Sequence, residues 1–302
     1  MSSDAPEARV GVVGLGVMGL GIAKRLVAAG LHVTGYDLSV SRRELLAELG
    51  GEPAATPFGV LRASPLVLTC LPSASALRAV VGGPDGLLSG EVPAGRMVVE
   101  ASTLGLDDKL WARDELRLAG VMLVDSPISG TEIQLEAGTA ILYASGEAEA
   151  VAVATAALAP AFGSVVDVGG FGNGTKVKLI ANHLVAIHNL AAAEALLLAE
   201  RAGLDPTTVL EALVSGAGSS RMLEVRGPMM AAGRYEPAQM SVGLFHKDLD
   251  LIAGFASAVG VRPELFDAAR LAYARALADG LGDSDTASLF SLLRREADSA
   301  TQ

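Results

Sequence analysis

The sequence predicts an α/β fold in which an N-terminal doubly wound parallel sheet is followed by an all-helical C-terminal domain. Three observations lead to this prediction. Short apolar runs alternate with amphipathic stretches up to about residue 170, a long stretch without Pro or Gly follows at 175–201, and only helical patterns recur after it. Strand–helix alternation is typical of a doubly wound sheet, and 302 residues are enough for two domains.

The apolar runs with strand character lie at residues 10–13, 32–36, 66–71, 97–101, 122–124, 140–144 and 165–168. Amphipathic stretches such as 19–29 and 41–49 separate several of them. Beyond residue 174 the apolar positions follow a helical period. We therefore expect a sheet domain over residues 1–167 and a helical domain over residues 168–302, with a long interdomain helix at about 174–201.

Composition narrows the class of function. The formal net charge of −11 provides no basic surface to neutralise phosphates, so a nucleic-acid partner is not expected. The single cysteine, Cys70, and four scattered histidines argue against a disulfide and against a metal site. No signal-peptide pattern opens the chain, and no uninterrupted apolar stretch has membrane-spanning length. These features predict a cytoplasmic protein without a membrane partner.

A glycine-rich loop follows the first predicted strand and opens the first predicted helix, with the sequence Gly14-Leu15-Gly16-Val17-Met18-Gly19. In this context the spacing is typical of a Rossmann-type, dinucleotide-binding unit. The first glycine makes the tight turn, the second lets the backbone approach a pyrophosphate at the helix N-terminus, and the third lets helix and strand pack closely. A purely structural glycine turn is the alternative.

Asp37 ends the second predicted strand, 18 residues after Gly19. A carboxylate there accepts hydrogen bonds from a ribose diol and repels a 2′-phosphate, which favours NAD over NADP as cofactor. Arg42 and Arg43 follow closely in sequence, so NADP stays open.

Two further segments place polar groups where a packed core does not need them. The step Ser129-Gly130 exposes a hydroxyl and backbone N–H groups, which suit a carboxylate. Lys178 and Asn182, four residues apart near the start of the long predicted helix, share one face, whereas Lys176 points away. Burial of an ammonium is costly and lowers its pKa towards the range of a general base. The alternative to a functional Lys178 is an ordinary lysine on the solvent-exposed face of the helix.

Taken in order, these motifs resemble the β-hydroxyacid dehydrogenase family, which includes 3-hydroxyisobutyrate dehydrogenase, and the resemblance runs from about residue 9 to residue 289. The family's cofactor loop, its DxPVSGG motif, its GxGxxxKxxxN motif and its KDL segment resemble residues 14–19, 125–131, 172–182 and 247–249. The resemblance implies an oxidoreductase that transfers a hydride between a small, carboxylate-bearing 3-hydroxy acid and a nicotinamide cofactor. It also implies a helical domain like that of 6-phosphogluconate dehydrogenase.

By this resemblance Lys178 is the general acid/base and Asn182 holds the oxygen atoms of the substrate. Ser129, Gly130 and the adjoining Thr131 receive the substrate carboxylate.

The same resemblance implies that Lys247 reaches both cofactor and substrate from the helical domain. It also implies that Leu71, Pro72 and Thr103 line the cofactor.

Two residues depart from the family pattern. Thr131 stands where the family has a second glycine, and Leu135 replaces a residue that is usually small. A β-branched residue restricts the backbone and adds bulk beside the carboxylate site, so we expect a substrate that differs from the simplest ones of the family. Residues 181–251 look most like the L-threonate dehydrogenase branch.

Two alternatives stay open: an imine reductase-like or other reductase on the same scaffold, and a non-catalytic NAD-binding protein. Imine reductases characteristically lack a lysine at the position of Lys178, and the intact Lys178–Asn182 pair argues against a protein that only binds. The Ala-rich, apolar helical half predicts a homodimer or homotetramer.

Overall fold

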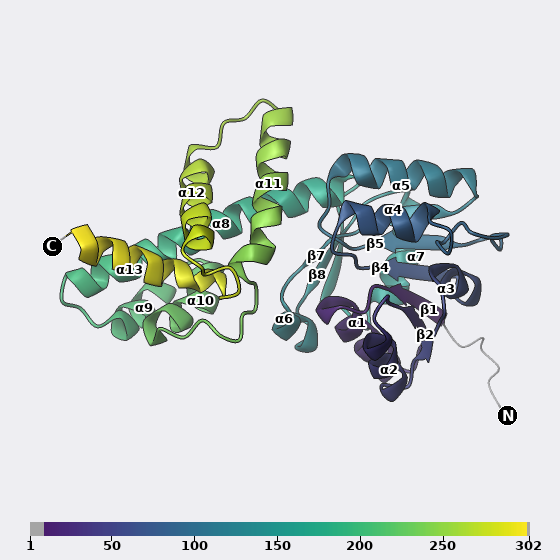
Figure 1. The fold of residues 1–302 in the computed structure, drawn as a ribbon, viewed down its shortest axis with the longest axis horizontal. Coiled ribbons are helices and arrows are strands. Elements are labelled where there is room, and N and C mark those ends of the chain that lie inside the picture. The colour runs from purple at the N-terminus through teal and green to yellow at the C-terminus, as the bar shows by residue number, and fades with distance from the viewer. Residues whose placement is uncertain (1–8, 301–302) are drawn as a thin grey trace. The chain divides into compact units, whose positions relative to one another are not determined.

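The computed structural model describes residues 9–300, and the chain divides into two compact units after Lys178 (Figure 1). The strand patterns of the sequence end at residue 167 and predict a boundary there. The first turn of helix α8 (Asn173–Arg201) instead belongs to the α/β unit, because its backbone is hydrogen-bonded to Asp125 and Ser145 there. Each unit is described by itself below.

The α/β unit contains a six-stranded sheet in the order β3-β2-β1-β4-β5-β6, with every pair parallel. Its elements in chain order are β1 (Arg9–Val13), α1 (Val17–Ala28), β2 (His32–Tyr36), α2 (Val40–Glu48), β3 (Glu52–Pro53), α3 (Pro57–Ala63), β4 (Leu66–Thr69), α4 (Ala74–Gly82), β5 (Met97–Glu100), α5 (Leu106–Leu118) and β6 (Met122–Asp125). The predicted doubly wound, Rossmann-type sheet is confirmed.

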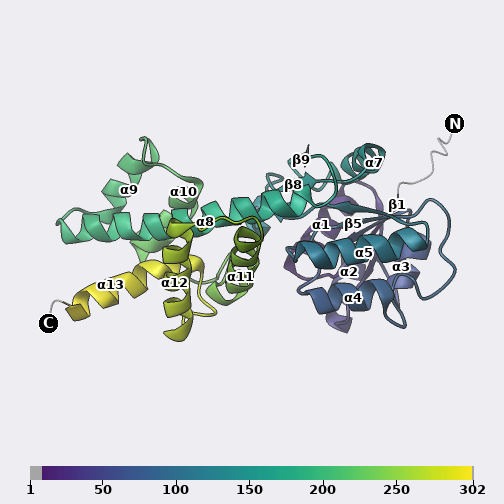
Figure 2. The ribbon, with the colours of Figure 1, turned by 90° about the horizontal axis from the view of Figure 1, so that it is seen from above.

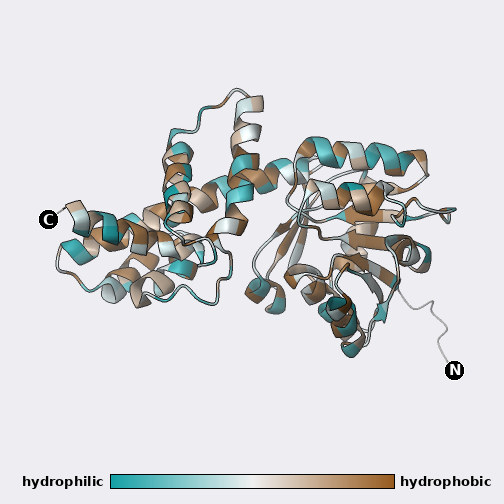
Figure 3. Cartoon of the chain, viewed as in Figure 1, coloured by the Kyte–Doolittle hydropathy of each residue, from teal (hydrophilic) through white to brown (hydrophobic). Residues whose placement is uncertain are grey.

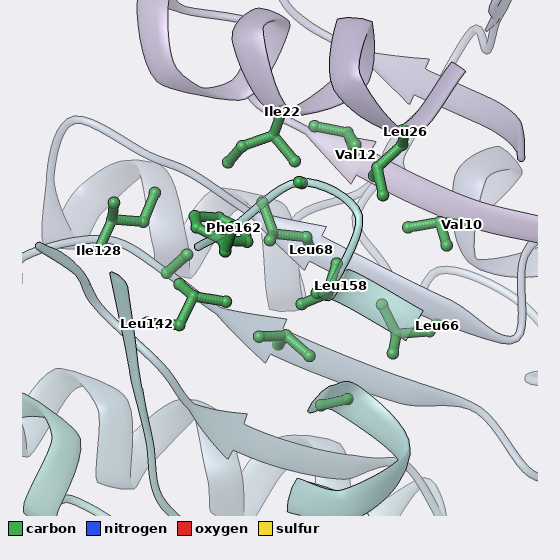
Figure 4. Packing of buried hydrophobic residues seen from close by; sticks show 14 of the residues in the cluster. Val10, Val12, Ile22, Leu26, Leu66, Leu68, Ile128, Leu142, Leu158 and Phe162 are labelled. Carbon is green, nitrogen blue, oxygen red and sulfur yellow. The ribbon is translucent and has the colours of Figure 1, made fainter. Parts of the chain in front are cut away.

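Alternate residues of the central strands pack on opposite faces of this sheet. Val10 and Val12 join the cluster that includes Ile22 and Leu26 of α1 (Figure 4), whereas Val13 joins the cluster on the other face with residues of α3, α4 and α5. In Figure 1, α1 and α2 lie on one side of the strands and α4 and α5 on the other. Burial on both faces explains why the strands are continuously apolar, as their brown colour in Figure 3 shows.

A second, three-stranded sheet was not expected. It has the order β7-β8-β9 and is built from β7 (Ile128–Ser129), β8 (Ile141–Ala144) and β9 (Ser164–Asp167), with α6 (Glu132–Glu136) and α7 (Ala148–Leu158) between its strands. The runs 140–144 and 165–168 therefore do not extend the main sheet. Pro127, which cannot donate to a ladder, follows β6, and β7 then pairs with β8 in antiparallel fashion.

Every named element in residues 179–300 is helical, which confirms the predicted helical half. After α8 come α9 (Pro206–Val214), α10 (Arg221–Ala232), α11 (Val242–Ala258), α12 (Glu264–Ala278), the 3₁₀-helix η1 (Thr286–Ser288) and α13 (Leu289–Ala300). Figure 2 shows these helices gathered along the C-terminal part of α8. By length and composition α8 is able to cross a membrane, and buried apolar side chains along it join the hydrophobic cluster of the helical unit.

Asp285, fully buried in the helical unit, holds three segments together. Its Oδ1 accepts from Arg226 Nε at 3.1 Å and from the Ala287 N–H at 2.9 Å. Its Oδ2 accepts from the N–H groups of Gln239 and Met240 at 2.9 and 3.1 Å. The carboxylate therefore neutralises a buried guanidinium and satisfies three backbone donors at once.

We expect Asp285→Ala to destabilise the protein by about 3–5 kcal/mol, because it leaves the Arg226 charge buried without its partner. Urea unfolding followed by circular dichroism measures this loss. The control Asp250→Ala removes an exposed partner of Arg270 and is expected to leave the midpoint nearly unchanged. Equal midpoints for the two variants would refute the assignment.

Candidate active site

The glycine loop lies between β1 and α1 and has the geometry that close approach to a nucleotide requires. Gly14 has φ 92°, and a Cβ there would lie 2.2 Å from the carbonyl oxygen of Cys70. A Cβ on Gly19 would lie 1.8 Å from the Gly14 oxygen, whereas a Cβ on Gly16, the exposed N-cap of α1, would meet no atom within 4 Å. The first and third glycines therefore serve packing, and the second leaves open space beside the α1 N-terminus. That combination fits a pyrophosphate.

Asp37 lies directly after β2 and is tied to this loop. Its Oδ2 accepts from the Leu15 N–H at 2.7 Å, and its Oδ1 accepts from the Ser39 N–H at 2.8 Å. Arg43 donates to the Asp37 carbonyl oxygen, and its guanidinium lies 5.8 Å from the centre of the Tyr36 ring. Arg43 is thus held by the backbone at this position.

The loops after β4 and β5 lie at the same edge of the sheet, because these strands are parallel neighbours. The Leu71 N–H donates to Ser102 Oγ at 2.7 Å, which joins the two loops. Leu71 and Thr103 are half-buried and Pro72 is exposed. All three lie at the carboxyl edge of the strands, as a cofactor-lining role requires.

Ser129 ends β7, and Gly130 follows with φ 145°, a conformation that favours glycine. Both residues are half-buried. Thr131 has an ordinary extended backbone and is the N-cap of α6 in a capping box, with its N–H donating to Gln134 Oε1 at 3.0 Å. The expected backbone restriction at Thr131 is therefore absent, since the strained position is Gly130.

Leu135 was expected to matter for the substrate because of its size. The structure places it in the hydrophobic core, fully buried, with its Cδ2 at 2.9 Å from where a Cβ on Gly21 of α1 would stand. Its bulk fills space against α1.

Lys178 and Asn182 lie one turn apart in α8. Lys178 is half-buried, whereas Lys176 bonds to Asn173 Oδ1 at 3.3 Å at the start of the helix. In the helical unit, Asn182 is buried and its Nδ2 donates to Asp248 Oδ2 at 2.8 Å. Lys247 is half-buried, with its Nζ 3.8 Å from Asp248 Oδ1.

Sequence reasoning missed the role of Asp248. It lies 66 residues from Asn182 in a stretch with the charge pattern of an ordinary exposed helix face, yet it is buried and orients the Asn182 amide. Only the folding of α11 against α8 reveals the pair. Among residues 9–300 no group of three or more His, Cys, Asp or Glu side chains is arranged to hold a metal ion.

The α/β unit, with its glycine loop and the acidic residue after β2, defines a dinucleotide-binding domain of the nicotinamide type. Comparison with known proteins extends this. The family model of the NAD-binding domain of 6-phosphogluconate dehydrogenase matches residues 9–170, and the model described as NAD-binding of NADP-dependent 3-hydroxyisobutyrate dehydrogenase matches residues 172–293.

Whole proteins give the same result. L-threonate dehydrogenase of Cupriavidus necator is 35% identical over 246 residues, which cover 80% of this chain and 82% of that protein. The 2-hydroxy-3-oxopropionate reductase of Escherichia coli is 34% identical, over 84% of this chain and 86% of that protein. The structure of 3-hydroxyisobutyrate dehydrogenase from Salmonella typhimurium matches with a TM-score of 0.84 at 28% identity, over 95% of this chain and all of that one.

The chain therefore belongs to the β-hydroxyacid dehydrogenase family, of the 3-hydroxyisobutyrate dehydrogenase type. The resemblance seen in the sequence is confirmed, and so is the class of protein: an NAD(P)-dependent oxidoreductase of the kind that acts on CH–OH groups.

The loop geometry predicts that Gly14→Ala weakens binding of the dinucleotide by at least about tenfold, because the new Cβ would displace the backbone of Cys70. Titration of NAD by protein fluorescence or calorimetry measures this. Gly95→Ala is the control, since Gly95 also has positive φ (73°) but a Cβ there would meet no atom within 4 Å. If both variants bind NAD with equal affinity, the close approach of Gly14 to the Cys70 backbone has no effect on cofactor binding.

Proposed function

We propose that the protein is an NAD-dependent dehydrogenase of a small 3-hydroxy acid, with Lys178 as general acid/base. The observation that carries this proposal is the start of α8. Its Thr175 N–H donates to Asp125 Oδ2 at 2.8 Å, where β6 ends. The glycine loop opens at the same edge of the sheet, at the end of β1, because the strands are parallel. Lys178 follows within one turn of Thr175.

When bound, the nicotinamide would supply the acceptor for a hydride, which leaves with two electrons from the carbon that bears the substrate hydroxyl. In the proposed reaction the uncharged Lys178 Nζ takes the proton of the substrate hydroxyl, and the alcohol becomes a carbonyl. In the reverse direction the ammonium returns that proton to the carbonyl oxygen. A positioned group of this kind contributes roughly 10²–10⁴-fold to the rate.

The other side chains would bind and orient the substrate. Ser129 Oγ and the Gly130 N–H suit its carboxylate, whereas the Thr131 N–H is engaged in the capping box. Asn182 offers one edge of its amide to the substrate oxygens, since its bond to Asp248 fixes the other edge. Lys247 supplies a cation on α11 that favours an anionic substrate.

The substrate class rests on the carboxylate-binding pattern and on the relatives. L-threonate dehydrogenase and 2-hydroxy-3-oxopropionate reductase are named for small oxygenated acids. We therefore propose a substrate of the L-threonate, glycerate or 3-hydroxyisobutyrate type, to be tested by a panel of these acids with NAD and NADP in parallel. We also propose that the protein is a cytoplasmic homodimer or homotetramer. Leu198, Leu265 and Leu271, which are 71%, 70% and 64% exposed, support self-association.

Replacement of Lys178 by Ala is expected to lower kcat by at least about 10²-fold while NAD still binds, because the proton acceptor is lost. Absorbance of the reduced nicotinamide measures turnover, and calorimetry measures binding. Lys176→Ala is the matched control, two residues away on another face of α8, and is expected to retain wild-type turnover. Near wild-type turnover in Lys178→Ala would overturn the proposed role.

Asp37→Asn is expected to raise the ratio of NADP to NAD use by about tenfold, since the carboxylate no longer repels a 2′-phosphate. An Asn oxygen still accepts the Leu15 N–H, which keeps the bond to the glycine loop, whereas the bond from the Ser39 N–H is lost. The measurement is kcat/KM with each cofactor, and Asp85→Asn, an exposed position after α4, is the control. An unchanged ratio would show that Asp37 does not select the cofactor.

A further inference from the structure

Three charged side chains are fully buried together at the carboxyl edge of the main sheet. Lys109 of α5 places its Nζ 2.7 Å from Oε2 of Glu100, which ends β5, and 2.8 Å from Oδ1 of Asp125, which ends β6. All three side chains are 0% exposed. Neither Lys109 nor Glu100 belongs to a motif that the sequence analysis singled out.

One ammonium and two carboxylates leave this cluster with an excess negative charge. A buried charge needs compensation, and the start of α8 supplies it. Asp125 Oδ2 accepts from the Thr175 N–H, and Asp125 Oδ1 accepts from Thr175 Oγ1, both at 2.8 Å. Ser145 Oγ donates to the same carboxylate at 3.1 Å and accepts the Gly174 N–H at 2.9 Å. The positive end of the helix dipole thus meets the excess charge.

The lysine in this cluster stays charged. Burial lowers the pKa of Lys109, but the charges of Glu100 and Asp125 together with their hydrogen bonds outweigh that effect and raise it above its usual value. The ammonium is therefore a fixed counter-charge, and without it two carboxylates would face each other in the interior.

The cluster also reaches the loop that lines the cofactor. Glu100 Oε1 accepts from the Ser102 N–H at 3.0 Å, and Ser102 Oγ in turn accepts from the Leu71 N–H. One set of buried bonds therefore joins the end of β5, the loop after β4 and the first turn of α8.

We propose that Lys109, Glu100 and Asp125 position the start of α8, and with it the Nζ of Lys178. This inference rests on the proposed function, in which Lys178 moves the proton. Lys178 follows Thr175 by three residues, so any displacement of the first turn carries the lysine with it. A shift of about 1 Å at a reacting group costs on the order of 10² in rate, so this cluster controls kcat without touching the substrate.

Lys109→Met tests the proposal. Without the ammonium the carboxylates repel each other, and the cap on α8 is disturbed. We expect kcat to fall by about 10- to 100-fold, with the KM values for NAD and for the hydroxy acid little changed. The primary deuterium isotope effect on kcat should rise, because the chemical step becomes limiting. A loss of folded protein alone would lower kcat with an unchanged isotope effect. Lys24→Met, which breaks the exposed pair with Glu136, is the matched control.

A double variant tests whether charge balance is the cause. Lys109→Met with Glu100→Gln removes one charge of each sign and leaves Asp125 to cap α8, so kcat should recover to within about threefold of wild type if the two sites are coupled. A double variant as slow as Lys109→Met, or a single variant with wild-type kcat and isotope effect, would overturn the inference.

If Lys109→Met does not fold, Asp125→Asn decides. It leaves Lys109 paired with Glu100 but removes the charge of Asp125, which caps α8 and also faces Lys109, so it should show the same fall in kcat and the same rise in the isotope effect. Wild-type values in this variant would overturn the inference. Wild-type turnover in Lys178→Ala would contradict the proposed function. A slow Lys178→Ala combined with an unimpaired Asp125→Asn would contradict only the positioning role.

Discussion

The hydrogen bond from the Thr175 N–H to the buried carboxylate of Asp125 is the interaction that ties the first turn of α8 to the main sheet. Helices begin near the carboxyl edge of a parallel sheet, and the first turn of each helix carries backbone N–H groups that have no partner within the helix. Asp125 accepts the Thr175 N–H of α8 directly. It also accepts from Ser145 Oγ, which in turn accepts the Gly174 N–H. Because Asp125 also ends β6, one residue joins the strand to the helix, and the position of the first turn of α8 follows from that of the sheet.

A buried ion pair is weak evidence for stability, since desolvation can exceed the attraction between the charges. The Lys109 cluster is better explained by the position it gives to its neighbours. The surface pairs of this chain, such as Arg113–Asp114 and Arg275–Glu296, are exposed and contribute little. The cluster at the sheet edge differs because every member is enclosed and bonded in several directions, so its geometry is fixed and is transmitted to the two loops and the helix that it contacts.

The sequence predicted the parts of this molecule that follow from local pattern. The buried strands and the glycine loop with its strand and helix depend on neighbours in the chain, and the choice of Lys178 over Lys176 by helical phase stays a prediction. Two strands show no strand pattern in the sequence. β3 is only two residues long, and β7 is defined by its pairing with β8. Thr131 was expected to strain the backbone, yet it caps α6, because Gln134 three residues on completes a capping box. Lys109 follows two aspartates and has the sequence pattern of an exposed helix residue. Its burial becomes evident only from its contacts with Glu100 and Asp125, which end β5 and β6.

The division of the chain inside α8 bears on how the lysine and the asparagine work together. The backbone of Lys178 belongs to the α/β unit, where Asp125 holds the start of the helix, whereas Asn182 is oriented in the helical unit by Asp248. Each side chain is therefore fixed by a different set of tertiary contacts. Their separation along the helix axis is nevertheless set by the helix itself, at about 6 Å for four residues. The spacing of four residues in one continuous helix therefore places the proposed proton-transfer group and the proposed substrate-binding group on the same face of α8.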